Sequence, residues 1–292
     1  MTSPNTKNIY ALPDARVIAS NVRMAIEEDI GVADFTAQLI PAAQQAEASI
    51  ISREPAVICG IAWVEQCFKQ IAPDSRITWH IHEGEQVQAK QTLCTITGNA
   101  RAMLSAERCA LNFLQTLSAT ASATKQYVDA ISGTNARILD TRKTLPGLRL
   151  AQKYAVTVGG GLNQRIALYD GILIKENHIA AAGSIPAAIA EANKIAAEQS
   201  SRNLSIQIEV ENLDELQAAL EAGAKLILLD NFDIQTLKAA VALNAKRAIL
   251  EASGGIDLNN VRDIALTGVD RISIGSLTKN VRAIDLSMRF SN

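Results

Sequence analysis

The chain has 292 residues, and its 28 lysines and arginines against 30 aspartates and glutamates give a formal net charge of −2. Hydrophobic residues make up 48% of the sequence and aromatic residues 4%. This is the composition of an ordinary globular protein, and the near-neutral charge argues against a nucleic-acid-binding protein with a large basic face. The length indicates two domains, or one α/β barrel with an extension.

Neither a membrane span nor a secretory signal is visible in the sequence. No stretch approaches the ~18 consecutive apolar residues that a spanning helix needs, and residues 1–8 are polar where a signal peptide would have an apolar core. The four cysteines show no C-x-x-C spacing: Cys59, Cys67, Cys94 and Cys109. We therefore expect reduced thiols and a cytoplasmic protein without membrane partners.

The first 131 residues predict a mixture of helices and antiparallel strands. Asp14 is placed to cap a helix that ends near Gly31. Short strands are expected at 48–52, 56–59, 77–81 and 91–97, with a helix at 63–71. Apolar residues at helical intervals predict a long helix over 101–131, with a break near 118–122 where serine and threonine are frequent.

From residue 137 on, short β-branched runs alternate with helical patterns. The expected strands are 137–142, 171–175, 206–211, 225–230, 248–253 and 271–276, and the expected helices are 184–199, 212–222, 233–242 and 257–267. This alternation is typical of βαβ units and a parallel sheet. Without a GxGxxG motif after the first strand, it favours a barrel over a dinucleotide fold, but too few strands are present to close one.

Charged residues follow the expected strands at their carboxyl ends, where barrel enzymes carry their active sites. One group is cationic and consists of Arg142, Lys143, Arg165 and Lys175; Glu209 and Asp230 form an anionic pair on neighbouring strands. Guanidinium groups bind carboxylate and phosphate, and a carboxylate pair suits Mg²⁺ with phosphate oxygens. The set therefore predicts one substrate with carboxylates and one with pyrophosphate. Salt bridging to nearby cations is the alternative for the two carboxylates.

Two glycine clusters, at 253–255 and 275–276, follow the last two strands, where barrels often hold phosphate. The triple glycine at 159–161 is not placed in this way and is equally well explained as a turn. His178 follows Lys175 and either supports the site or is structural. His80 and His82 share a strand face without a third ligand nearby, so we interpret them as surface residues.

Several segments together resemble the quinolinate phosphoribosyltransferase family, also called carboxylating nicotinate-nucleotide pyrophosphorylases. The longest is Asp140-Thr-Arg-Lys-Thr-Leu-Pro-Gly-Leu-Arg149. The others include Glu107-Arg-Cys-Ala-Leu-Asn-Phe-Leu-Gln115, Leu173-Ile-Lys-Glu-Asn-His178, Glu209-Val-Glu211, Leu229-Asp-Asn231, Leu250-Glu-Ala-Ser-Gly-Gly-Ile256 and Ile274-Gly-Ser-Leu-Thr278. The resemblance runs from about residue 14 to the end of the chain.

The resemblance implies an enzyme of de novo NAD biosynthesis. Quinolinate and phosphoribosyl pyrophosphate would give nicotinate mononucleotide, pyrophosphate and CO₂, with Mg²⁺ as cofactor. It implies an N-terminal α/β sandwich domain over residues 1–120, with residues 281–292 packing back on it. Residues 121–280 would form an irregular, incomplete parallel α/β barrel of six or seven strands. The protein would be a homodimer with sites completed across the interface.

Residue roles follow from the same resemblance. Arg142, Arg165 and Lys175 would hold the carboxylates of quinolinate, and Arg108 would come from the partner subunit. Lys143 would contact phosphoribosyl pyrophosphate, with Thr141 beside it. Glu209 and Asp230 would bind Mg²⁺ and the ribose. The 5′-phosphate would lie on Ser253, Gly254, Gly255, Ile274, Gly275 and Ser276. Lys143, Lys175, Glu209 and Asp230 are the residues expected in catalysis.

One departure concerns the quinolinate pocket, where the family commonly has His-Arg and this chain has Gln164-Arg165. A glutamine can donate a hydrogen bond but cannot shuttle a proton, so a positioning role is expected for Gln164. Three alternatives stay open at this point: a molybdenum-transport-linked relative acting on another base, a Schiff-base aldolase using Lys175, and a non-catalytic oligomeric binding protein.

Overall fold

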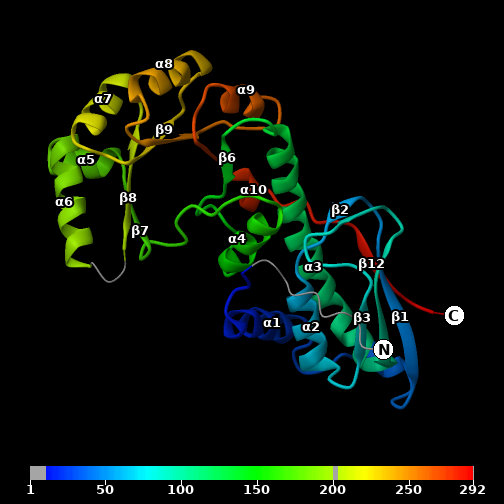
Figure 1. Ribbon diagram of the computed structural model, residues 1–292. Helices are drawn as coiled ribbons and strands as arrows, with labels where there is room; N and C mark the ends of the chain where they lie inside the picture. The colour runs from blue at the N-terminus through cyan, green and yellow to red at the C-terminus, as the bar shows by residue number, and fades with distance from the viewer. Residues whose placement is uncertain (1–10, 200–202, 292) are drawn as a thin grey trace. The chain divides into compact units, whose positions relative to one another are not determined.

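The computed structural model describes residues 11–199 and 203–291 (Figure 1). The polar start of the chain, on which the expectation of a missing signal peptide rests, lies outside the described residues. Two compact units are formed. The first comprises Met1–Lys125, Leu145–Gly160 and Thr278–Asn292, and the second comprises Gln126–Thr144 and Gly161–Leu277. The first unit thus takes in residues 145–160 as well as both ends of the chain.

An antiparallel sheet of four strands, in the order β12-β1-β5-β3, forms one layer of the first unit. Its strands are β1 (Gln45–Ser52), β3 (Arg76–Trp79), β5 (Thr92–Asn99) and β12 (Leu286–Phe290), and a separate pair is formed by β2 (Ala56–Val57) and β4 (Gln86–Val87). Alternate residues of β1, namely Ala48, Ile50 and Ser52, are buried. Because successive side chains of a strand point to opposite sides, one side of the sheet packs into the core and the other side is turned toward solvent.

Helices cover the buried face of that sheet. They are α1 (Ala15–Asp29), α2 (Ile61–Ile71), α3 (Ala100–Ala130) and α4 (Arg149–Val158), with a short 3₁₀ turn, η1 (Ala37–Leu39). Asp14 caps α1 by accepting a hydrogen bond from the N–H of Arg16, as expected. Side chains of α1, α2, α3 and α4 share one hydrophobic core with the sheet, and within it the rings of Trp63 and Tyr154 lie 5.8 Å apart. The N-terminal sandwich expected from the resemblance is therefore present.

The break expected in the long helix is wrong, because α3 is continuous through residues 118–122. The serine hydroxyl groups form hydrogen bonds with a neighbouring segment and do not interrupt the helix. Ser118 Oγ accepts from the N–H of Cys59 at 2.9 Å, and Ser122 Oγ accepts from the N–H of Val57 at 2.8 Å. The polar side chains that suggested a break satisfy backbone groups of the segment that begins with β2.

The second unit contains six strands in one parallel sheet, at the positions expected from the sequence. They are β6 (Arg137–Leu139), β7 (Gly171–Ile174), β8 (Ser205–Val210), β9 (Leu226–Asp230), β10 (Ile249–Ser253) and β11 (Arg271–Ser273). Their order is β6-β11-β10-β9-β8-β7, and every pairing is parallel. In the described part of the chain β6 and β7 do not pair, so the sheet stays open, as predicted for an incomplete barrel.

Helices connect these strands and lie along the sheet (Figure 1). They are α5 (Glu176–Ala182), α6 (Ile185–Glu198), α7 (Leu213–Glu221), α8 (Ile234–Asn244) and α9 (Val261–Leu266), followed by the short α10 (Ser276–Lys279). Ser184, Asn212 and Asp233 cap α6, α7 and α8 through their side-chain oxygens. Among the described residues, no helix has the length and apolar character that crossing a membrane requires.

Candidate active site

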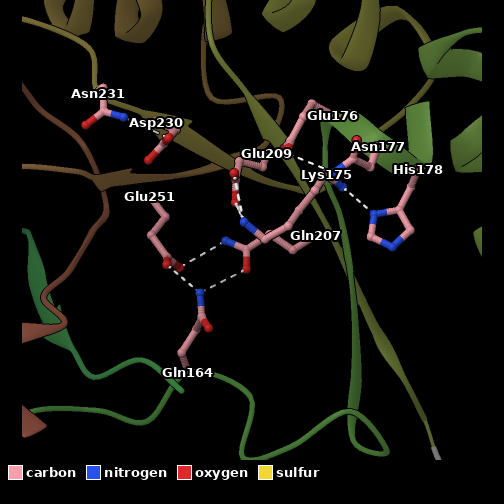
Figure 2. A network of polar contacts seen from close by, with 10 residues as sticks. All are labelled: Gln164, Lys175, Glu176, Asn177, His178, Gln207, Glu209, Asp230, Asn231 and Glu251. Atoms are coloured by element: carbon pink, nitrogen blue, oxygen red, sulfur yellow. Dashed lines mark hydrogen bonds and ion pairs between the residues drawn. The ribbon is translucent and has the colours of Figure 1, made fainter. Parts of the chain in front are cut away.

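Polar side chains at the carboxyl ends of β8, β9 and β10 share one face of the parallel sheet. Glu209 on β8 and Glu251 on β10 both lie level with Leu228 on the strand between them. Two residues further along, Asp230 lies level with Ser253. Because residues at one level of adjacent strands point to the same side, and residues two apart do so as well, these side chains face one region. Figure 2 shows other polar side chains converging on them.

Lys175, the first residue after β7, forms an ion pair with Glu209. Its Nζ lies 2.7 Å from Oε2 and 2.9 Å from Oε1 of that carboxylate. The Glu209 side chain is 11% exposed and the Lys175 side chain 43%. The cation therefore compensates a carboxylate that is largely removed from water. For Glu209, the structure therefore shows the salt bridge that the sequence analysis named as the alternative to metal binding.

His178 supports the turn that carries Lys175. The backbone N–H of Lys175 donates to His178 Nδ1 at 3.0 Å, and the N–H of His178 donates to the carbonyl oxygen of Lys175 at 2.8 Å. Since Nδ1 accepts a hydrogen bond, it carries no proton in this arrangement. His178 thus fixes the start of α5, directly beside the ion pair.

Asp230 at the end of β9 is tied to the loop after β10 through Asn231. Asn231 Nδ2 donates to Asp230 Oδ2 at 2.9 Å, and the N–H of Asn231 donates to the carbonyl oxygen of Ser253 at 2.9 Å. Gly254 has a φ of +101°, and a Cβ placed there would lie 2.1 Å from Asn231 Oδ1. Glycine is therefore required at 254 for two reasons, backbone conformation and the close approach of Asn231.

Two guanidinium groups lie near each other on the loops after β6 and before β7. Arg165 Nη1 donates to the carbonyl oxygen of Gly171 at 3.1 Å. Burial lowers the pKa of Arg165, the positive charge of Arg142 lowers it further, and the carboxylates of Asp170 and Glu209 oppose both effects. Two cations that disfavour each other's charge form a ready site for an anion, whose binding would relieve the repulsion.

The loops after β6 and β11 approach each other closely. Thr141 Oγ1 accepts from the N–H of Lys143 at 3.1 Å. A Cβ on Gly275 would lie 3.1 Å from Cδ of Lys143 and 3.5 Å from Thr141 Oγ1. The structure therefore brings together Thr141, Lys143 and Gly275, with the buried Ile274 before the glycine and Ser276 after it, at the start of α10.

Gln164 belongs to a network of buried polar groups that the sequence did not reveal (Figure 2). Its Nε2 donates to Glu251 Oε1 at 2.9 Å and to Gln207 Oε1 at 3.4 Å, while Gln207 Nε2 donates to Glu251 Oε2 at 3.0 Å. Asp140, fully buried, accepts from the backbone N–H of Gln164 at 2.9 Å. Strand periodicity was the available signal for Gln207, since it lies two residues before Glu209 and so on the same face.

A hollow of about 200 Å³ lies next to Glu209 and is lined by Glu176, Ile179, Ala180, Glu209, Glu211 and Glu215. With four carboxylates around it, this hollow repels an anionic ligand. Anions are better accommodated by the cations on the loops around 142, 165 and 175. Arg108, the remaining predicted site residue, lies in the first unit, on α3, where it is exposed.

Comparisons with known proteins bear on these residues. The family model "Quinolinate phosphoribosyl transferase, C-terminal domain" matches residues 120–289, and the corresponding N-terminal domain model matches residues 34–118. The chain belongs to the quinolinate phosphoribosyltransferase family. The family, the fold class and the enzyme class expected from the sequence, a carboxylating nicotinate-nucleotide pyrophosphorylase, are therefore confirmed.

Individual relatives are similar in sequence to nearly the whole of this chain. The nicotinate-nucleotide pyrophosphorylase [carboxylating] of Mycobacterium leprae is 40% identical, covering 91% of this chain and 95% of the relative. A probable enzyme of the same name from Bacillus subtilis is 39% identical and covers 89% of each chain. The solved nicotinate-nucleotide pyrophosphorylase of Francisella tularensis is 42% identical, with a TM-score of 0.92, and covers 98% of this chain and 100% of that one.

The family assignment decides between the alternatives left open by the sequence, and the geometry agrees with it. Schiff-base chemistry needs a neutral lysine amine. Lys175 instead forms an ion pair with both oxygens of Glu209. A transferase of this family is also not a mere binding protein, and the reported relatives are pyrophosphorylases rather than molybdenum-linked proteins.

Proposed function

We propose that this chain transfers the phosphoribosyl group of phosphoribosyl pyrophosphate to the ring nitrogen of quinolinate and releases CO₂, pyrophosphate and nicotinate mononucleotide. This is the carboxylating pyrophosphorylase reaction that the family and its relatives are named for. The observation that carries the proposal is the set of charges on one face of the parallel sheet. Lys175 and Arg165 stand near the carboxylate of Glu209, and Asp230 lies on the neighbouring strand, as a dianionic acceptor and a pyrophosphate donor require.

The quinolinate carboxylates would lie on Arg142, Arg165 and Lys175. Arg142 and Arg165 repel each other, so a dianion that pairs with both gains from each contact. Lys175 would contact the same ligand together with the two arginines, once its ion pair with Glu209 is broken. Gln164, next to Arg165 in the chain, would line the same pocket.

Phosphoribosyl pyrophosphate would lie on the loops after β6, β10 and β11. Lys143 and Thr141 are in reach of Gly275, where the missing side chain leaves room for a phosphate to approach the backbone. The backbone N–H groups of residues 253–255 and 274–276 would hold the 5′-phosphate. Glycines at 254 and 275 support this assignment, because larger residues there would displace Asn231 and Lys143.

The donor set at the ends of β8 and β9 fits Mg²⁺ that arrives with pyrophosphate. Mg²⁺ uses one or two carboxylates together with water and phosphate oxygens, which Glu209 and Asp230 would provide. In the described part of the chain no group of three or more His, Cys, Asp or Glu side chains is placed to hold a metal by itself. When bound, Mg²⁺ would neutralise charge on the pyrophosphate.

Transfer then needs no covalent nucleophile on the protein. The ring nitrogen forms a bond to C1′ of the ribose while the C1′–O bond breaks, and pyrophosphate leaves with that electron pair. Positive charge that develops on the sugar is stabilised by the carboxylates of Glu209 and Asp230, and Lys143 would stabilise the leaving group. The alkylated pyridinium then accepts the electrons left when the ring–carboxylate bond breaks, and CO₂ departs as the ring carbon takes up a proton.

A homodimer with shared sites and a cytoplasmic location complete the proposal. The exposed Arg108 on α3 would reach the active site of the partner subunit. Val32, Phe35 and Leu39 are 97%, 72% and 84% exposed, which is unusual for apolar side chains and suits an interface with a second copy. All four cysteines are free thiols, as a reducing compartment favours.

Pyrophosphate release tests the proposed reaction directly. Purified protein is supplied with phosphoribosyl pyrophosphate, Mg²⁺ and either quinolinate or nicotinate, and both pyrophosphate and CO₂ are measured. Release of both in equal amounts with quinolinate supports the proposal. Activity with nicotinate and none with quinolinate would overturn it.

A further inference from the structure

Gln152 on α4 is a fully buried amide that joins two segments of the chain. Its Oε1 accepts a hydrogen bond from the backbone N–H of Leu145 at 2.8 Å, and its Nε2 donates to the carbonyl oxygen of Thr278 at 2.8 Å. Nε2 also makes a longer contact, at 3.5 Å, with Thr120 Oγ1 on α3. Both ends of the amide are therefore engaged by protein groups, and this fixes which way the amide is turned.

The turn before α4 brings Gln152 to the first of these segments. The N–H of Leu148 donates to the carbonyl oxygen of Leu145 at 3.2 Å, with Pro146 and Gly147 between them and a φ of +76° at the glycine. Proline followed by a glycine of positive φ is typical of a type II turn. The N–H of Gln152 then donates to the carbonyl oxygen of Leu148 at 2.8 Å. Its side chain thus returns to the residue at which the turn begins.

The same two segments are joined a second time, at the ends of two paired strands. The backbone N–H of Ile274, which follows β11, donates to the carbonyl oxygen of Leu139, the last residue of β6, at 2.9 Å. Residues 140–144 and 275–277 therefore lie between two ties, one in the sheet and one through Gln152. The two segments cannot separate at either end without breaking one of these ties.

The segments between the ties carry residues proposed to bind phosphoribosyl pyrophosphate. Thr141 and Lys143 lie on residues 140–144, the Lys143 loop, and Gly275 and Ser276 lie on residues 275–277, the Gly275 loop. A Cβ on Gly275 would be 3.1 Å from Lys143 Cδ, so the two loops nearly touch there. Gln152 itself is buried and engaged by protein groups. It can therefore influence the ligand only through the loops that it holds.

We propose that Gln152 is a positioning residue that sets the spacing between the Lys143 loop and the Gly275 loop, and with it the fit of phosphoribosyl pyrophosphate. This inference rests on the proposed function. Loops that must be ordered on binding cost free energy, so donors that are already in place bind an anionic ligand more tightly. Tying both loops at both ends supplies that order. Quinolinate has only Arg142 on these loops and should depend less on Gln152.

The main test is Gln152→Met, which keeps the length of the side chain and removes the amide. We expect the Kd for phosphoribosyl pyrophosphate, measured calorimetrically with Mg²⁺ and without quinolinate, to rise about 10-fold, since a displacement of about 1 Å can cost up to about 100-fold. The KM for quinolinate should rise less than about threefold. Unchanged binding of phosphoribosyl pyrophosphate by folded Gln152→Met would overturn the proposal. Equal increases in the KM values of both substrates would also overturn it, since they would mark a general structural role.

Asn244 at the end of α8 provides a matched control. It is 4% exposed, its Nδ2 donates to the carbonyl oxygen of Ala248 at 2.8 Å, and its Oδ1 accepts from the N–H of Ala248 at 3.0 Å. Asn244→Leu thus also removes a buried amide that bridges backbone groups, but before the amino end of β10. It should lower the Tm as Gln152→Met does and leave both KM values unchanged. A similar loss of phosphoribosyl pyrophosphate binding in Asn244→Leu would overturn the proposal, because lost stability would then explain both effects.

A double-mutant cycle shows whether Gln152 acts through the Lys143 loop. In Lys143→Ala the cation of that loop is gone, so adding Gln152→Met should weaken binding of phosphoribosyl pyrophosphate by less than about threefold. Fully additive effects would contradict the proposal.

Gln152→Asn serves if Gln152→Met fails to fold. It keeps an amide but is one methylene too short to reach both Leu145 and Thr278, so binding of phosphoribosyl pyrophosphate should again weaken by about threefold or more. Parental affinity in Gln152→Asn would contradict the proposal. Failure of the unmodified chain to bind phosphoribosyl pyrophosphate would instead contradict the proposed function.

Discussion

The ammonium group of Lys175 lies 2.7 Å and 2.9 Å from the two carboxylate oxygens of Glu209. A cation proposed for quinolinate and a carboxylate proposed for Mg²⁺ are thus bound to each other. Each ligand must compete with this ion pair. Whichever binds first releases the partner that the other needs, so the two substrates should favour each other's binding.

Metal binding without phosphoribosyl pyrophosphate should therefore be weak. Mn²⁺, a paramagnetic substitute for Mg²⁺, should bind the free enzyme more tightly after Lys175→Met, by about fivefold or more, the factor for roughly 1 kcal/mol. Electron paramagnetic resonance of free Mn²⁺ measures this. Lys238→Met removes an exposed lysine of α8 and serves as control. Equal Mn²⁺ affinity in the parent chain and Lys175→Met would show that the ion pair does not restrain Glu209.

Gly254 and Gly255 are adjacent, but alanine should have different effects at the two positions. Both have positive φ, +101° and +59°, so alanine costs roughly 1–2 kcal/mol of backbone strain at either. Only at Gly254 would the added Cβ also strike Asn231, which holds Asp230. Gly254→Ala should raise the KM for phosphoribosyl pyrophosphate at least about 10-fold, and Gly255→Ala by less than about threefold. Similar KM values for the two variants would contradict the proposed coupling between these loops.

The four cysteines should be unreactive in the folded protein. Burial raises the pKa of Cys67 and Cys94 to about 12 and that of Cys109 to about 11, and it raises the pKa of Cys59 well above its usual value. Because the thiolate is the reactive form, raised pKa values keep these thiols inert at pH 8, whereas unfolding returns them to a pKa of about 8.5. A thiol-specific chromogenic reagent should detect none before denaturation and all four after it. Rapid reaction of the native protein would contradict the burial.

Much of the second unit could be predicted because each of its strands has its own local signal. β8 and β9, for example, are short β-branched runs that end in Glu209–Val210 and Asp230, and parallel topology places such ends at one edge. The network around Glu251 could not be predicted in the same way. Its contact with Gln164 joins residues 87 positions apart, and only the packing of the sheet determines which side chains meet. The continuous α3 was missed for a related reason, since the partners of Ser118 and Ser122 lie more than 55 residues away.

Quinolinate alone should stabilise the folded protein, because it relieves the repulsion between Arg142 and Arg165. In Arg165→Gln the ligand-induced increase in Tm should disappear, and kcat/KM for quinolinate should fall on the order of 100-fold, as expected for the loss of charge-assisted hydrogen bonds worth roughly 3 kcal/mol. The Tm without ligand should change little, since the mutation also removes a half-buried charge that Arg142 repels. Differential scanning fluorimetry measures the Tm with and without quinolinate, and the pyrophosphate-release assay gives kcat/KM. A full quinolinate shift in Arg165→Gln would exclude this residue from the pocket.

A shared active site makes a specific prediction for mixed subunits. Arg108→Ala and Arg142→Ala should each abolish activity, because one removes the arginine proposed to come from the partner and the other removes an arginine of the subunit's own loop. In a mixed dimer one site carries both changes and the other carries neither, so about one active site in two is restored. Co-expression with two different affinity tags isolates the mixed species for pyrophosphate-release measurements, and each variant purified alone is the control. Inactive mixed dimers, verified by mass spectrometry, would show that Arg108 serves its own subunit or no site at all.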